Sequence, residues 1–146
     1  MTKLEKLQHK AHIQGIHIDN FSFCQIKKAV CFYDPATGYK VILLDKAKIE
    51  NTTEETQILA EEIGHYETNS LYCSQATTNM PSAKLTRTKS EIRAKKWAFE
   101  YMLLPNDIKR AIDEGHETKY ELADELGVTE CFLVDAIEYY KTKGEL

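Results

Sequence analysis

The stretch that decides the fold lies near the middle of the chain and reads Ile58-Leu59-Ala60-Glu61-Glu62-Ile63-Gly64-His65-Tyr66. At 100° per residue on a helix, Glu61, Glu62 and His65 share one side, whereas the large apolar residues gather on the other. The side chains able to hold a metal ion are thereby separated from those able to build a core. The pattern predicts an amphipathic helix.

The polar side of this helix carries a spacing suited to metal chemistry. A carboxylate and an imidazole at positions i and i+4, such as Glu61 and His65, can bind one metal ion, and Glu62 beside them can take a proton from a water molecule. The spacing is that of the HExxH pattern, with Glu61 in the place of the first histidine. Two glutamates and a histidine on a helix are also typical of a solvated face, so the spacing leaves both interpretations open.

A third ligand is offered by a second predicted helix, over about residues 89–103, which stops before Pro105. Glu91 falls on its apolar stripe, in line with two alanines that would let another helix approach closely. An ionised carboxylate on such a stripe is costly unless it is paired or bound to a metal. We therefore expect Glu91 either to bind a metal or to form a buried ion pair with Arg87 or Arg93.

Two segments together carry a family resemblance. ILAEEIGHYET at residues 58–68 and SEIRAKKWAFEYMLLP at residues 90–105 closely resemble the small phage and mobile-element proteins of the ImmA/IrrE metallopeptidase family. The resemblance implies a zincin-like domain in which His65 and Glu91 are zinc ligands and Glu62 is the catalytic general base. Glu61 occupies the position of the family's first ligand, usually histidine. Two carboxylates and one imidazole form a harder site, which favours manganese or weakly held zinc.

The resemblance also implies a function. We expect a metal-dependent endopeptidase, a hydrolase of a phage or integrated element, whose protein partner and substrate is a cognate helix-turn-helix repressor. The alternative is a catalytically degenerate zincin-like binding module that holds no metal and regulates the repressor by contact without proteolysis. A DNA-binding regulator is a third, weaker alternative.

Length and composition agree with one globular domain. The chain has 146 residues, 42% hydrophobic and 29% charged, which predicts a single domain over residues 1–146. Its net charge of -4 argues against a general nucleic-acid binder. No apolar run approaches the roughly 18 residues of a membrane span, and the polar start does not resemble a signal peptide, so we expect a cytoplasmic protein. We expect the four cysteines, which include no CxxC pair, to be buried and not disulfide-bonded: Cys24, Cys31, Cys73 and Cys131.

The remaining patterns predict an α+β fold that is mostly helical. Residues 1–50 should form a helix over 3–14, ended by Gly15, and a β-hairpin with strands at 29–33 and 39–45. Residues 51–104 should hold the two metal-site helices, the first over 53–68 behind a capping box at Thr52 and Glu55. Residues 69–88 between them read as a long, functional loop.

Residues 105–146 should form a short helix up to Gly115 and then a pair that resembles a helix-turn-helix, with Thr118 and Thr129 at its helix starts and Gly127 at the turn. The last of these helices has no Arg, Lys, Asn or Gln over residues 130–140 to contact a base edge. We therefore expect it to pack on the core or dock a protein partner, not to bind nucleic acid. No ligand spacing with a carboxylate or cysteine partner is found at the other histidines: His9, His12, His17 and His116. His9 and His12 could share a helix face, which we expect to be solvated.

Overall fold

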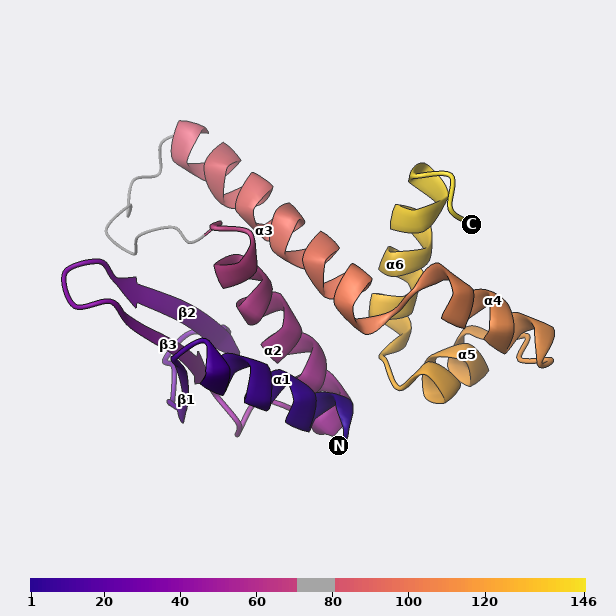
Figure 1. The fold of residues 1–146 in the computed structure, drawn as a ribbon, viewed down its shortest axis with the longest axis horizontal. Helices are drawn as coiled ribbons and strands as arrows, with labels where there is room; N and C mark the ends of the chain where they lie inside the picture. The colour runs from indigo at the N-terminus through magenta and orange to yellow at the C-terminus, as the bar shows by residue number, and fades with distance from the viewer. Residues whose placement is uncertain (71–80) are drawn as a thin grey trace.

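The computed structural model describes the backbone of residues 1–70 and 81–146 and the side chains of residues 1–70 and 88–146. These residues form six helices and one three-stranded sheet (Figure 1), so the predicted class, α+β and mostly helical, is confirmed. In chain order the elements are α1 (Lys3–Ile13), β1 (Ile16–Asn20), β2 (Ala29–Asp34), β3 (Tyr39–Leu44), α2 (Thr52–Glu67), α3 (Pro81–Met102), α4 (Pro105–Asp113), α5 (Lys119–Leu126) and α6 (Glu130–Thr142).

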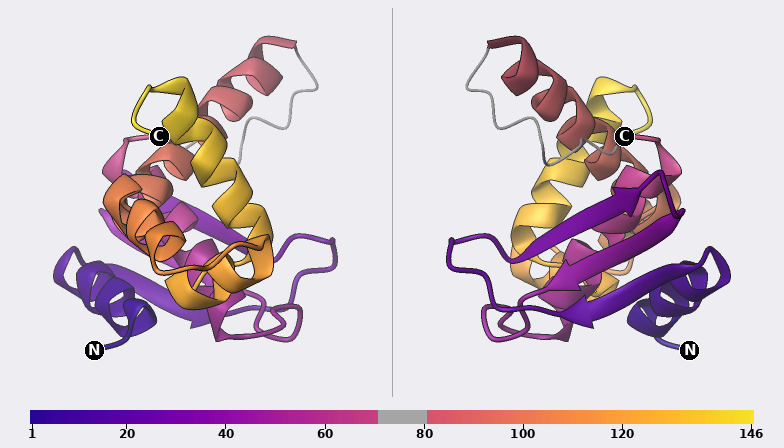
Figure 2. Two further views of the ribbon diagram at one scale, coloured as in Figure 1. Left: turned by 90° about the vertical axis from the view of Figure 1, so that its right-hand side faces the viewer. Right: turned by 90° about the vertical axis from the view of Figure 1, so that its left-hand side faces the viewer.

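The sheet has the order β1-β3-β2, with the helices on one side of it (Figure 2). The predicted hairpin is confirmed: β2 and β3 pair antiparallel, and the turn between them ends at Gly38 with φ +74°. Strand β1, which pairs parallel with β3, was not predicted. Its five residues Ile-His-Ile-Asp-Asn carry only two apolar side chains, too short an alternation to recognise before its partner is known.

Helix α2 begins one residue earlier than predicted. Its N-cap is Asn51, whose Oδ1 accepts a hydrogen bond of 2.9 Å from the Glu54 amide, while the Glu54 carboxylate accepts one of 2.8 Å from the Glu50 amide. The expected capping box at Thr52 and Glu55 is therefore wrong. Asparagine is at least as good an N-cap as threonine and precedes it in the chain, so the helix starts there.

Helix α3 is longer than predicted. Residues 81–88 were expected to belong to a loop, but they form the first two turns of α3, which begins at Pro81. Proline suits a helix start because its missing amide would have no partner there. The polar stretch that follows lacks the apolar periodicity of a core-facing helix, so no pattern there predicts a helix. Residues 71–80 of the expected loop lie outside the described residues.

The C-terminal helices pack against the rest of the molecule, as expected for α6. The Tyr140 hydroxyl donates a hydrogen bond of 2.7 Å to the Leu103 carbonyl, and the rings of Phe132 and Phe99 meet edge to face. Helix α5 starts at the predicted cap, Thr118, and ends at Gly127. The start of the chain reaches the same region, because Lys3 Nζ donates to the Leu126 carbonyl at 2.7 Å and to the Met102 carbonyl at 3.3 Å.

The cysteines are less buried than expected. Cys24 and Cys131 are exposed, Cys31 is partly buried on β2, and all three are free thiols; Cys73 lies outside the described residues. The prediction of burial was wrong for Cys24 and Cys131 because it rested on a tendency of the residue type and not on a pattern in the chain. Within the described part of the chain, no helix combines the length and apolar character needed to cross a membrane.

Helices α2 and α3 cross in close contact at Gly64. A Cβ atom placed on Gly64 would lie 2.6 Å from the backbone oxygen of Ala94 and 3.1 Å from its Cα, so this position accepts only hydrogen. The apolar sides of both helices meet on either side of this point, where Leu59, Ile63 and Ala98 are fully buried. The crossing therefore sets the distance between the two helices.

We expect Gly64→Ala to destabilise the protein by about 1 to 3 kcal/mol, because overpacking against a backbone atom forces the helices apart. The gain in helix propensity, about 1 kcal/mol, offsets only part of that cost. Urea unfolding followed by circular dichroism measures the change. Arg93→Ala, on the exposed side of α3, is the control and should change stability by less than about 0.5 kcal/mol. A Gly64→Ala protein as stable as the wild type would contradict this account.

Candidate metal centre

His65 is held in one orientation by the chain that follows its helix. Its side chain is buried, and ring atom Nδ1 lies 3.1 Å from the Ser70 carbonyl oxygen. Since a carbonyl can only accept, Nδ1 is the donor in this contact. Nε2 is then the atom that can donate to a carboxylate when it is protonated, or bind a metal ion when it is not. The Ser70 amide in turn donates to the His65 carbonyl at 2.9 Å, which fixes both ends of the turn. Histidines that bind metals are usually oriented by such a bond from the second ring nitrogen.

Glu91 lies opposite His65 across the helix crossing. Its Oε2 is 3.5 Å from His65 Nε2, and its side chain is 44% exposed. The close contact of Gly64 with Ala94 explains the meeting, because His65 follows Gly64 directly and Glu91 precedes Ala94 by about one turn. The structure thus brings together two of the predicted ligands. The alternative partner Arg87 is among the side chains outside the described set.

Opposing effects act on the His65 imidazole. Burial, the largest single effect, lowers its pKa, but the hydrogen bond to Glu91 and the negative charges of Glu62 and Glu91 together outweigh burial. The net result is a raised pKa. A positive charge is therefore favoured at this position by the surrounding carboxylates, whether a proton or a cation supplies it.

Glu62 faces the sheet beside His65. Burial raises the pKa of its carboxyl group to about 7, although His65 and the Cys31 thiol, which is hydrogen-bonded to it, both act in the opposite direction. Burial and the neighbouring Glu62 charge also raise the pKa of Cys31. A carboxylate with a pKa near neutral pH is well suited to accept and return a proton.

Glu61 does not join His65 and Glu91. Within the described residues, the ligand atoms of these three side chains do not all lie within 4.8 Å of one another. Burial raises the pKa of Glu61, an effect opposed chiefly by the positive charge of Lys95 on α3. The predicted three-residue ligand set is therefore not assembled in this arrangement.

Three neighbours of this site were not found from the sequence. Ser70 contributes a backbone carbonyl, which no side-chain pattern reveals, and the buried Ser90 hydroxyl donates a hydrogen bond to that same carbonyl. Cys31 lies opposite Ile42 on the helix-covered face of the sheet. The alternation of the predicted hairpin places Cys31 on that face, so this residue could have been found.

A second group of potential ligands lies at the junction of α4 and α5. The ligand atoms of Glu114, His116 and Glu125 all lie within 4.8 Å of one another. The expectation that His116 has no carboxylate partner was therefore wrong. The spacing of Glu114 and His116, two residues apart across Gly115, was the available signal, whereas Glu125 comes near only through the packing of α5.

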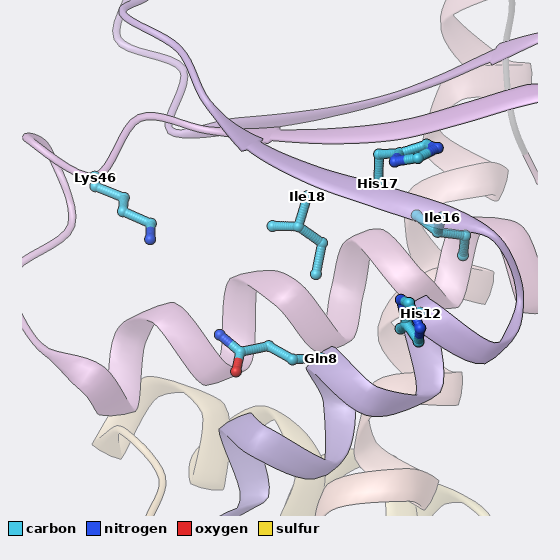
Figure 3. Close-up of a pocket in the computed structure, with 6 residues that line it drawn as sticks. All are labelled: Gln8, His12, Ile16, His17, Ile18 and Lys46. Atoms are coloured by element: carbon cyan, nitrogen blue, oxygen red, sulfur yellow. The ribbon is translucent and has the colours of Figure 1, made fainter.

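A shallow pocket of about 350 Å³ lies between α1 and β1, away from both groups (Figure 3). Gln8 and His12 reach it from α1, and Figure 3 shows His12 on the helix side of β1 and His17 rising from the other side. The His17 ring instead stacks on Tyr39 at 5.1 Å. No carboxylate or thiol lines this pocket, so its two histidines do not make a metal site.

The chain was compared with protein-family models, curated proteins and solved structures, and nothing matched in any of the three comparisons.

In metal-free protein, we expect His65 to stabilise the fold at low pH. Its pKa rises on folding from about 6.5, so the stabilisation is fully present below that pH and is lost as the pH rises through the raised value. Glu91→Gln should lower the His65 pKa, which NMR titration of the imidazole in the presence of EDTA would measure. Glu100→Gln, on the outer side of α3, is the control and should leave the His65 pKa unchanged. An unaltered pKa in Glu91→Gln would show that the pair does not interact in solution.

Proposed function

We propose that this protein is a cytoplasmic metal-dependent endopeptidase of a phage or integrated element. His65 and Glu91 are its metal ligands, Glu62 is its general base, and Glu61 supplies a third ligand after rotating toward the site. The observation that carries the proposal is the approach of Glu91 Oε2 to His65 Nε2, at 3.5 Å, with Nδ1 held by the Ser70 carbonyl. The resemblance of both helices to the ImmA/IrrE family supports it.

The donor set suits a transition metal. Two ligand atoms that bind one ion at about 2.0 to 2.2 Å stand roughly 3 to 3.5 Å apart, close to the observed separation. One imidazole with carboxylates suits Zn²⁺, and a more oxygen-rich set suits Mn²⁺. When bound, such an ion polarises a scissile carbonyl and acidifies a water molecule.

The protein's own groups would move the proton. Glu62, with its pKa raised to about 7, accepts the proton of the attacking water and can pass it to the leaving amine. His65 stays oriented because the Ser70 carbonyl accepts a hydrogen bond from its Nδ1. Glu91 stays near because moving α2 and α3 apart at Gly64 would lose the close packing between them. The family resemblance suggests a helix-turn-helix repressor as the substrate.

A binding module that holds no metal and regulates the repressor by contact alone is the second candidate. One observation favours it: Glu61 stands in the place of a histidine, and its ligand atoms do not come within 4.8 Å of those of both His65 and Glu91. A set of two ligands binds metal weakly, so a protein of this kind could keep the fold and the partner while losing the chemistry.

Replacement of Glu62 separates the two candidates. Glu62→Gln keeps the size and polarity of the side chain but cannot accept a proton, so a peptidase should lose cleavage by at least about 100-fold while still binding metal and repressor. Cleavage is followed on a gel with the repressor encoded in the same element, and operator release is measured in parallel. Glu55→Gln, in the first turn of the same helix, is the matched control and should cleave normally.

Operator release by Glu62→Gln at the wild-type rate, with the repressor intact, would contradict the peptidase and support the binding module.

Replacement of Glu61 tests the third ligand. Glu61→His should tighten zinc binding by at least about tenfold if position 61 contacts the ion, since even groups that only support a ligand are worth 10- to 100-fold in affinity. Zinc titration against a competing chelator measures the change. Adding Glu91→Gln should weaken zinc binding in both the wild type and Glu61→His. An affinity that is unchanged by Glu61→His would place residue 61 outside the ion's ligands.

A further inference from the structure

We infer that the chain carries a second divalent-metal site, formed by Glu114, His116 and Glu125 where α4 meets α5. It shares no residue with the site proposed on α2 and α3. Its ligand atoms lie within 4.8 Å of one another, and His116 Nε2 is 3.8 Å from Glu125 Oε2. Ligands of a bound ion stand roughly 3 to 3.5 Å apart, so the three groups need to close by at most about 2 Å.

The backbone fixes the positions of Glu114 and His116 at the end of α4. The Glu114 amide donates to the Arg110 carbonyl at 2.9 Å, and the His116 amide donates to the carbonyl of the buried Ala111 at 3.3 Å. Gly115 between them adopts φ +99°, which reverses the chain at the end of α4. The loop therefore presents Glu114 and His116 together without a ligand to hold them.

The third ligand comes from a different element. Glu125 lies in the last turn of α5, between residues that are anchored in the core, since Leu122 and Leu126 are both largely buried. The two carboxylates thus come from different elements, and the packing of α5 brings their ligand atoms and one ring nitrogen of His116 within 4.8 Å of one another. A bound ion would join the end of α4 to the end of α5.

Competing interactions at this site are weak. Arg110 Nε is 4.0 Å from Glu114 Oε1, and both side chains are more than half exposed, so solvent screens the pair. Glu121, a further acid on which the charge of His116 acts, is already engaged because its carboxylate accepts hydrogen bonds from the amides of Glu117 and Thr118. A metal would therefore displace little when it binds.

The donor set indicates the class of metal. Mg²⁺ and Ca²⁺ prefer oxygen ligands alone, whereas one imidazole and two carboxylates suit Mn²⁺ or moderately held Zn²⁺. The glutamates are each about half exposed and His116 is 31% exposed, which leaves the remaining positions around the ion to water. The site is accordingly one that binds metal at the surface and strengthens the α4–α5 junction.

The test uses untagged, full-length protein in the His65→Ala background, so that the outcome does not depend on the site proposed on α2 and α3. Zinc chloride is titrated by calorimetry at pH 7.5. His65→Ala should bind one equivalent and should melt at a higher temperature with zinc than without it. Adding His116→Ala should weaken binding at least tenfold and abolish the shift, and Glu125→Gln should do the same.

The matched control adds His9→Ala, which removes an exposed histidine from α1 and should leave zinc binding as it is in His65→Ala. Circular dichroism without zinc confirms that each variant is folded. Two results would overturn the inference: a His65→Ala protein that binds no zinc, or one whose binding is unaffected by His116→Ala and Glu125→Gln. Either result leaves the His65–Glu91 proposal standing, since that site is absent from every protein tested.

Discussion

The contact of Gly64 with the backbone of Ala94 is the constraint on which the candidate site depends. It lets α2 and α3 approach until main chain meets main chain, so that side chains one residue or one turn away face each other. This close packing, and not electrostatic attraction between the helices, brings His65 and Glu91 together. The energy that holds a charged pair together here comes from apolar packing nearby, where Leu59, Ile63 and Ala98 are shielded from water.

Parts of the fold with a local signal were predictable, and those set by distant contacts were not. The hairpin and the cap at Thr118 follow from turn and capping residues within a few positions. Strand β1 depends on a partner more than twenty residues away, and its own two isoleucines do not identify it. The first turns of α3 are polar, so they lack the periodicity that reveals a buried helix.

The same distinction applies to the candidate site. His65, Glu62 and Glu91 could be proposed because helical spacing shows which side chains share a face and which carboxylate falls on an apolar stripe. The convergence of Glu61 could not be judged from spacing, because it depends on a rotamer and on the charge of Lys95 on another helix. Glu125 near His116 was likewise invisible, since two helices must pack before the side chains meet. Spacing thus identifies candidates, and packing selects among them.

The hydrogen bonds of the Lys3 side chain affect how the molecule unfolds. Its ammonium group joins α1 to the C-terminal ends of both α3 and α5, whose last carbonyls carry partial negative charge. Partial burial of the ammonium group lowers the pKa of this lysine, and its two hydrogen bonds to main-chain carbonyls fix its position. The three sequence segments that surround it therefore have little freedom to open one at a time. Hydrogen exchange at the ends of α3 and α5 should report the loss of α1, and proteolysis near residue 3 would loosen two helix ends that lie 99 and 123 residues away in the chain.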